Sequence, residues 1–276
     1  MGRVQGKVAF VTGAARGQGR SHAIRLAEEG ADIIAVDLCG PIDSVDHYAP
    51  STREDLEQTV KEVERLDRRI VARVADVRDV DALRAVTDEG AVELGGLDIV
   101  VANAGIAGFG RAHELTEQAW RDEIDINLTG VWHTAKVAVP HMLARGAGSM
   151  IFTSSVAGLR GVANVAHYVS AKHGIVGLMR SMAIELGPHH IRVNTVNPTT
   201  VDTAMIQNEG IYRLFVPDGE NLTKESVAPA FEQINTIPVP WVEAIDVSNA
   251  VLFLASEEAR YISGISLPVA AGATAR

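Results

Sequence analysis

The chain has 276 residues, of which 47% are hydrophobic and 22% charged, so it can bury a large core and is neither disordered nor collagen-like. Its formal net charge of −10 argues against nucleic acid or an anionic membrane as partner, because both carry phosphates. The single cysteine excludes an intrachain disulfide, and without an apolar run of spanning length or a secretory signal pattern we expect a cytoplasmic protein.

Short β-branched runs alternate along the chain with longer segments of helical periodicity. The predicted strands cover residues 8–12, 33–36, 70–74, 97–102, 150–153, 191–196 and 265–269. The predicted helices cover residues 18–29, 53–66, 80–94, about 116–144, 165–186 and about 246–256. This alternation predicts an α/β fold with one doubly wound parallel sheet and helices on both faces.

Two segments interrupt the alternation and are longer than usual connections. Residues 38–52 are inserted between the second strand and its helix, and residues 198–241 are polar and contain several Pro and Gly residues. Loops of this length more often cover a functional site than extend a scaffold. Because no repeat or linker divides the rest, we expect residues 1–276 to form a single domain, with the insertion at 38–52 and a substrate-covering segment at about 198–241.

A glycine-rich turn, Thr12-Gly13-Ala14-Ala15-Arg16-Gly17-Gln18-Gly19, follows the first strand. Glycines at such a turn let the backbone approach a pyrophosphate, and the helix that follows offers N–H groups to the anion, as in Rossmann-like folds. Asp37 ends the second strand, where an acid can bind the adenosine ribose and repel a 2′-phosphate, which favours NAD over NADP. Arg16 could pair with such a phosphate or stay solvated. The alternative is a purely structural turn with a solvated acid.

These residues resemble those of the short-chain dehydrogenase/reductase family, and the resemblance extends from Thr12 to Gly272. Asn103-Ala104-Gly105 is similar to the family's N-N-A-G motif, with Ala102 in place of the first Asn. The N-P-G segment is matched by Asn197-Pro198, with Thr199 in place of Gly. The family's catalytic Ser…Tyr-x3-Lys signature and its helix Asn are matched by Ser155, Tyr168, Lys172 and Asn127.

The same residue types suit the oxidation of an alcohol. A tyrosine with its ordinary pKa near 10 is a poor base at neutral pH, but an ammonium one helical turn away lowers that pKa. We therefore expect Tyr168 to act as base with help from Lys172, while Ser155 hydrogen-bonds the substrate oxygen. The resemblance implies that Lys172 also holds the nicotinamide ribose and that Asn127 anchors a water in a proton relay. Each of the four, taken alone, could be an ordinary structural residue.

The resemblance also implies further contacts to NAD. Asp76 and Val77 would frame the adenine, and Pro198, Thr200 and the residues after them would lie by the nicotinamide carboxamide and the phosphates. No metal site is expected. The expected cofactor-binding residues are Gly13, Arg16, Gly17, Gln18, Gly19, Asp37, Leu38, Asp76, Val77, Asn103, Ala104, Gly105, Tyr168, Lys172, Pro198, Thr200, Val201 and Thr203.

Within the family, the sequence resembles the carveol dehydrogenase-like enzymes associated with the redox cofactor mycofactocin. The resemblance rests on GAARGQGRSH at 13–22, VDLCG at 36–40, NPTTVDT at 197–203 and the insertion after Asp37. It implies NAD that does not exchange and an external carrier, such as mycofactocin, that collects the electrons. A loop of residues 38–52 folded over the adenosine would slow release, although it could also be a surface loop without a cofactor role.

We therefore predict an enzyme that oxidises a small hydrophobic secondary alcohol, carveol-like or terpenoid, to a ketone with NAD. The alternatives are an NADPH-dependent ketone reductase and a non-catalytic NAD-sensing protein. The substrate pocket is expected to use apolar residues of the covering segment, which could equally pack that segment onto the body: Met205, Ile206, Ile211, Tyr212, Leu214 and Phe215.

The resemblance also implies a homotetramer in which the helices near 116–144 and 165–186 pair across two-fold axes. Small side chains on these helices would allow close approach or serve the core of one protomer: Ala135, Val137, Ala138, Ala166 and Ala171.

Overall fold

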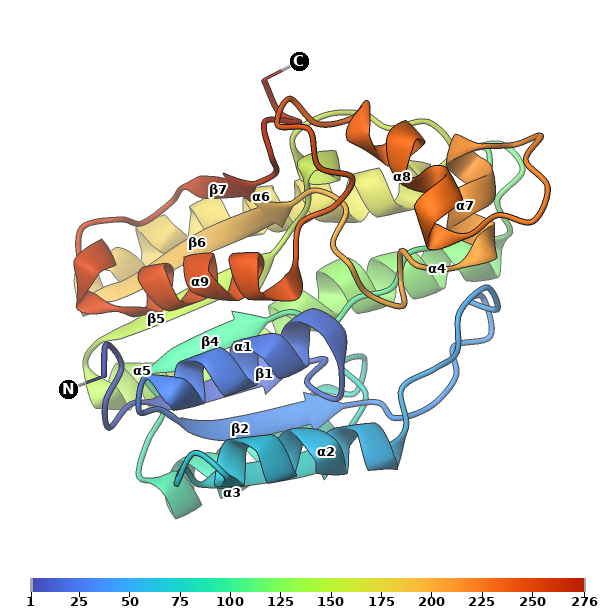
Figure 1. The fold of residues 1–276 in the computed structure, drawn as a ribbon. Helices are drawn as coiled ribbons and strands as arrows, with labels where there is room; N and C mark the ends of the chain where they lie inside the picture. Colours follow the sequence, from blue (N-terminus) through green and yellow to red (C-terminus); the bar gives the residue numbers. More distant parts are fainter. Residues whose placement is uncertain (1, 276) are drawn as a thin grey trace.

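The computed structural model describes residues 2–275, which build a seven-stranded parallel sheet (Figure 1). The spatial order is β3-β2-β1-β4-β5-β6-β7, and every neighbouring pair is parallel. The strands are β1 (Val8–Thr12), β2 (Asp32–Asp37), β3 (Ile70–Val74), β4 (Ile99–Ala102), β5 (Gly148–Thr153), β6 (Ile191–Pro198) and β7 (Ser266–Val269). The strand order reverses between β1 and β4, and in such sheets ligands bind beyond the carboxyl ends of the strands at this point.

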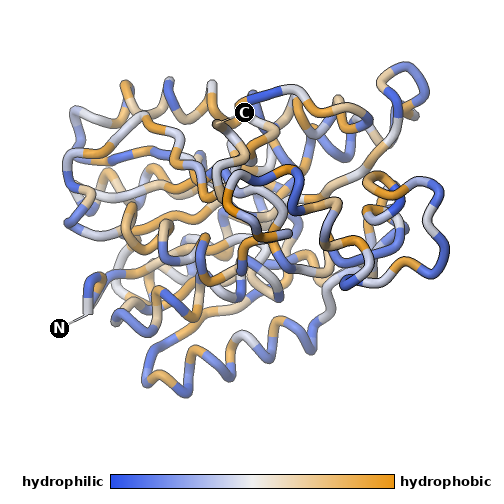
Figure 2. Tube along the Cα trace, turned by 45° about the horizontal axis from the view of Figure 1, so that its top comes forward, coloured by the Kyte–Doolittle hydropathy of each residue, from blue (hydrophilic) through white to orange (hydrophobic). Residues whose placement is uncertain are grey.

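Helices cover both faces of the sheet, as the sequence predicts. One face carries α1 (Gly17–Glu28), α2 (Arg53–Glu64) and α9 (Ala244–Ala255). The other face carries α3 (Val80–Leu94), α5 (Gly130–Arg145) and α6 (Ala166–Leu186). Because both faces are covered, the strands β1 and β4 are buried along their whole length, which explains their uninterrupted apolar sequences. Figure 2 shows the complementary pattern on the outer helices, where hydrophilic and hydrophobic residues alternate.

The long helical stretch predicted near 116–144 is helical but not uniform. It consists of α4 (Glu117–Ile124), a π-helical turn η1 (Asp125–Thr129) and α5. The side chain of Asn127 in η1 pairs with the backbone of Ile106, donating from Nδ2 to its carbonyl oxygen at 2.9 Å and accepting from its N–H at 3.0 Å. A wide turn inserts one residue without breaking the helix, so sequence periodicity does not reveal it.

The covering segment contains two short helices that the sequence analysis does not predict, α7 (Glu209–Phe215) and α8 (Lys224–Glu232). Each begins at a capping side chain, Asn208 or Thr223, and the helices lie beyond the carboxyl ends of the strands (Figure 1). They are short, and Pro229 lies inside α8, so their hydrophobic pattern is too brief to identify a helix.

Three 3-10 turns complete the described elements: η2 (Val156–Gly158), η3 (Gly187–His189) and η4 (Glu257–Ala259). The predicted strand and helix boundaries agree with the structure within a few residues. No helix within residues 2–275 is both long enough and apolar enough to cross a bilayer.

Candidate active site

A cavity of about 410 Å³ lies at the carboxyl ends of β1, β2 and β4, where the strand order reverses. Its lining brings together residues that lie far apart in the sequence and were predicted to bind the cofactor: Gly13, Arg16, Gly17, Gln18, Gly19, Asp37, Leu38, Asp76, Val77, Asn103, Ala104, Gly105 and Thr203. The walls also include residues of the insertion, among them Ile42, Val45 and Tyr48.

A smaller cavity of about 70 Å³ continues from the first, since Gln18, Gly105 and Met205 line both. Its lining contains five further predicted residues: Ser155, Tyr168, Lys172, Pro198 and Val201. Thr200 lines neither of these two cavities, and its hydroxyl donates to the carbonyl oxygen of Pro240 at 3.0 Å. This bond joins the start of the covering segment to its end.

The glycine-rich turn is packed so closely that side chains cannot replace Gly13 or Gly19. Gly13 has φ +68°, and a Cβ there would lie 2.8 Å from Cα of Ala104. A Cβ on Gly19 would lie 1.9 Å from the carbonyl oxygen of Gly13. At the same place Oε1 of Gln18 is buried and has no hydrogen-bond partner among residues 2–275. A glycine cradle with an unused acceptor fits a dinucleotide whose ribose hydroxyls and carboxamide can donate.

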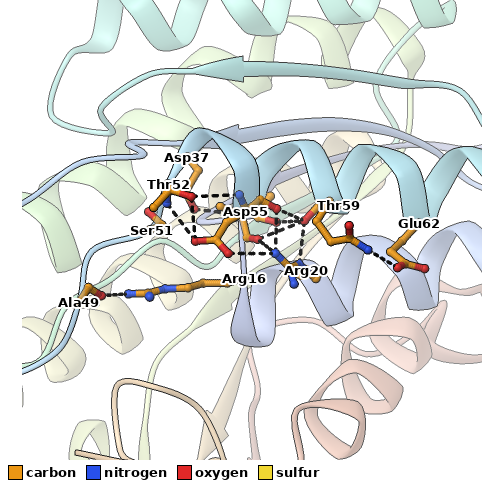
Figure 3. A network of polar contacts seen from close by, with 12 residues as sticks. Arg16, Arg20, Asp37, Ala49, Ser51, Thr52, Asp55, Thr59 and Glu62 are labelled. Atoms are coloured by element: carbon orange, nitrogen blue, oxygen red, sulfur yellow. Dashed lines mark hydrogen bonds and ion pairs between the residues drawn. The ribbon is translucent and has the colours of Figure 1, made fainter.

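Asp37 holds the two ends of the insertion in addition to lining the cavity (Figure 3). Its Oδ1 accepts from the N–H of Cys39 at 3.1 Å and from the hydroxyl of Ser51 at 2.6 Å. Its Oδ2 accepts from the N–H of Ala15 in the glycine-rich turn at 2.9 Å. Asp37, which was expected to favour NAD over NADP, therefore also joins the glycine-rich turn, the end of β2 and the insertion.

Arg16 extends from the glycine-rich turn to the insertion and is not a freely solvated side chain (Figure 3). Its Nη2 donates to the carbonyl oxygen of Ala49, and its guanidinium lies 5.9 Å from the ring centre of Tyr48. Arg20, one turn along α1, donates to the carbonyl oxygens of Ala15 at 2.5 Å and Asp55 at 2.7 Å. These contacts fix the insertion and the start of α2 against the turn.

The rest of the insertion crosses the sheet edge toward α4 and the covering segment. The Ser44 hydroxyl donates to Oδ2 of Asp122 at 2.7 Å, and the His47 ring packs edge-on against Phe109 with 4.8 Å between centres. Tyr48 bonds to the backbone of Ala107, and burial raises the pKa of this phenol to about 12. The insertion therefore forms a wall of the large cavity between β2 and the segment after β4.

Ser155, Tyr168 and Lys172 meet at the small cavity from two elements, the end of β5 and the first turns of α6. Tyr168 hydrogen-bonds Ser155, and Nζ of Lys172 lies 5.4 Å from the Tyr168 ring centre. The ammonium is fixed by a 2.8 Å hydrogen bond to the carbonyl oxygen of Thr153.

The surroundings of Tyr168 and Lys172 shift both of their pKa values. Burial raises the pKa of Tyr168 to about 12, and its bond to Ser155 acts in the opposite direction. Burial lowers the pKa of Lys172 to about 8, against the negative charge of Glu123. Both shifts disfavour the charged forms, so this pair becomes an effective base only if further positive charge stabilises the phenolate.

Glu123 is a site residue that the sequence analysis missed. It is 1% exposed, and its Oε1 accepts from Nδ2 of Asn127 at 2.5 Å. Burial raises the pKa of this carboxyl to about 8. A signal for Glu123 was present in the sequence, since it lies four residues before Asn127. Residues at this spacing face the same side of a helix, as Tyr168 and Lys172 do.

The apolar residues expected to line a substrate pocket have two different positions. Met205 and Ile206 line the small cavity beside Tyr168. The other four pack the covering segment together: Ile211, Tyr212 and Leu214 join a separate cluster around Phe231, and Phe215 stacks on Phe231 with 4.1 Å between ring centres. No group of His, Cys, Asp and Glu within residues 2–275 is arranged to hold a metal ion.

The chain is similar in sequence to a known protein family and to individual known proteins. A family model described as short chain dehydrogenase matches residues 7–211. A (−)-trans-carveol dehydrogenase from Rhodococcus erythropolis is 59% identical over 278 residues, covering 99% of both chains.

Two solved structures are similar over the whole chain. Carveol dehydrogenase from Mycobacterium avium in complex with NAD superimposes with a TM-score of 0.99 at 56% identity and covers 100% of both chains. A short chain dehydrogenase from Mycobacterium paratuberculosis bound to NAD has a TM-score of 0.92 at 42% identity, again over 100% of both chains.

Proposed function

The chain belongs to the short-chain dehydrogenase/reductase family, and on that basis we propose that it oxidises a small hydrophobic secondary alcohol, carveol-like or terpenoid, to a ketone with NAD as cofactor. The observation that carries the proposal is the position of Ser155, Tyr168 and Lys172 at a small cavity that continues into the large one. The apolar side chains of Met205 and Ile206 beside Tyr168 suit a hydrophobic alcohol.

In this proposal the large cavity holds the cofactor. The turn from Gly13 to Gly19 binds the phosphates, Asp37 binds the adenosine ribose, and Asp76 with Val77 borders the adenine. NAD supplies the acceptor for the hydride and a positive charge on its nicotinamide.

The residues of the small cavity perform the proton chemistry. Ser155 donates its hydroxyl hydrogen to the substrate oxygen and holds it beside the phenol. The Tyr168 phenolate takes the hydroxyl proton, while the ammonium of Lys172 stabilises the anionic form of the phenol before that transfer. To Asn127, which is buried, the proposal gives the role that the family resemblance implies, anchoring a water in a proton relay.

We further propose that NAD stays bound between turnovers and that an external carrier, such as mycofactocin, collects the electrons. The support is the insertion, which walls the large cavity and is tied to the glycine-rich turn by Arg16 and to β2 by Asp37. Protein denatured after extensive dialysis should release NAD. Absence of NAD in that extract, or rapid multiple turnover with free NAD, contradicts this part of the proposal.

A homotetramer is proposed from exposed apolar residues on α5 and α6. The side chains of Trp132 and Ile184 are 42% and 79% exposed. Of the five small residues that could serve either helix contacts or the core, four are buried within the protomer: Ala135, Val137, Ala138 and Ala171. Sedimentation velocity measures the assembly directly, and a monomer would contradict it.

The proposal is tested with a panel of secondary alcohols and an artificial electron acceptor. Reduction of the acceptor should require protein and should be fastest with cyclic hydrophobic alcohols. A protein that only senses NAD would reduce nothing with any alcohol. A biosynthetic reductase would instead consume a ketone with NADPH, and the charge of Asp37 together with the engagement of Arg16 by Ala49 disfavours that cofactor.

A further inference from the structure

Gly210 lies in the first turn of α7, at a point where the insertion meets the covering segment (Figure 1). Glycine weakens a helix, so its position here needs a reason in the packing. A Cβ on Gly210 would lie 2.9 Å from Cβ of His47 in the insertion and 3.0 Å from Cζ of Phe109 in the segment after β4. The rings of His47 and Phe109 are themselves in edge-on contact, with 4.8 Å between their centres. Three segments therefore meet at a place that has no space for a methyl group on α7 unless the insertion shifts.

On the side of the insertion, this contact continues to the cofactor cavity. The His47 ring packs edge-on against the ring of Tyr48, with 4.8 Å between centres. Tyr48 and Val45 line the large cavity, and the guanidinium of Arg16 in the glycine-rich turn lies 5.9 Å from the Tyr48 ring centre. A displacement of His47 is therefore passed to a wall of the cavity proposed for NAD.

On the side of the covering segment, α7 is tied to residues of the small cavity. The Asn208 side chain caps α7 by accepting from the N–H of Ile211 at 3.0 Å, and its Nδ2 donates to the carbonyl oxygen of Met205 at 3.0 Å. Ile206 packs in the same hydrophobic cluster as Ile211. Met205 and Ile206 line the small cavity beside Tyr168. A movement of α7 therefore carries with it the apolar wall of the proposed substrate site.

We propose that the contact of His47 and Phe109 with Gly210 makes the insertion and the covering segment open and close as one unit, so that a ligand in the small cavity slows the release of NAD from the large one. This inference rests on the proposed function, which places the substrate in the small cavity and NAD in the large one. A ligand that packs against Met205 and Ile206 holds α7 in place, and α7 then holds the insertion against the cofactor. By the same coupling, bound NAD favours the closed position of the covering segment.

Two substitutions perturb this contact from its two sides. In Gly210→Ala the added methyl group pushes His47 and the insertion away from α7, although alanine itself favours a helix more than glycine does. His47→Ala removes the ring that packs on Phe109 and Tyr48 and crowds nothing. Because both substitutions break one contact, their effects in the double variant should be smaller than the sum of the single effects.

The release of NAD is measured on protein produced in cells that are fed labelled nicotinic acid. The protein is mixed with an excess of unlabelled NAD, and the label that it retains is followed over time with and without carvone. Carvone is the ketone that oxidation of carveol gives, and a ketone does not react with the oxidised cofactor. It is applied at a concentration that inhibits alcohol oxidation, so that the small cavity is occupied.

In wild type we expect carvone to slow the release of NAD by about tenfold, which is within the usual range for two coupled sites. In Gly210→Ala and in His47→Ala, release without carvone should be faster, and carvone should slow it by less than about threefold. The matched control is Gly187→Ala, before β6 at the amino ends of the strands, where a Cβ would meet nothing within 4 Å. This variant should behave as wild type.

Equal slowing by carvone in wild type and in both variants would show that the ketone only blocks the exit of NAD, and that result overturns the inference. The absence of slowing in wild type, or fully additive effects in the double variant, also overturns it. If Gly210→Ala does not fold as judged by circular dichroism, His47→Ala carries the same expectation alone. Failure of wild type to oxidise any alcohol refutes the proposed function and this inference with it, whereas normal oxidation with equal slowing refutes this inference alone.

Discussion

The insertion should slow the release of NAD, and replacing Arg16 by Leu should measure by how much. This change removes the bond to the Ala49 carbonyl oxygen and the contact of the guanidinium with the Tyr48 ring. Because Arg16 is half-buried, we assign the charged hydrogen bond about 1 kcal/mol and the cation–π contact about 0.5 kcal/mol. The sum of about 1.5 kcal/mol corresponds to release that is roughly tenfold faster.

The assay traps released NAD with an excess of a second dehydrogenase and follows its reduction over time. Tyr48→Leu is the companion variant, since it removes the phenol bond to Ala107 and the partner of Arg16 while leaving the charge in place. If the insertion retains the cofactor, both variants release NAD faster. If the charge of Arg16 merely attracts the phosphates, Tyr48→Leu has no effect and Arg16→Lys behaves as wild type. Unchanged release in both Leu variants would refute the role of the insertion.

Two further predictions concern buried polar groups. Burial lowers the pKa of His22 to about 3, so the stability that its neutral form confers is complete above the unfolded pKa near 6.5 and is lost as pH falls toward 3. Urea denaturation at pH 7 and pH 5 measures the free energy of unfolding of wild type and of His22→Asn. Between pH 7 and pH 5 this free energy should fall by about 2 kcal/mol more in wild type than in the variant. Equal decreases in the two proteins would contradict the prediction. Asp37→Asn keeps an acceptor for Ser51 but removes the charge facing a 2′-phosphate, so the preference of the apoprotein for NAD over NADP should narrow by about tenfold or more. An unchanged ratio of the two dissociation constants would show that Asp37 does not choose the cofactor.

The sheet was predictable because its signal is local. Parallel strands covered on both faces are continuous apolar runs, as in residues 8–12 and 97–102, and the helices between them repeat every three to four residues. The helices α7 and α8 escaped prediction because they are short and stabilised by packing around Phe231, which no local pattern records. The turn η1 escaped because Asn127 holds it through Ile106, a contact across the fold.

The same distinction between local and long-range signals applies to the residues of the candidate active site. Residues recognisable by spacing, such as Tyr168 and Lys172, are brought together on one helix at the small cavity. Residues whose importance depends on distant partners were missed: Glu123 is defined by Gly108 and His167, and Tyr48 by the backbone of Ala107. Asp37 was assigned to the ribose, but its bonds to both ends of the insertion could not be read from a single sequence.

The reduction of bound NAD in a single turnover tests the assignment of the base most directly. Wild type and Tyr168→Phe, each carrying NAD, are mixed with a secondary alcohol, and the absorbance of the reduced nicotinamide is followed. We predict that the variant retains NAD but forms reduced cofactor about a thousandfold more slowly, because general base catalysis is lost. Reduction at the wild-type rate in Tyr168→Phe would contradict the account.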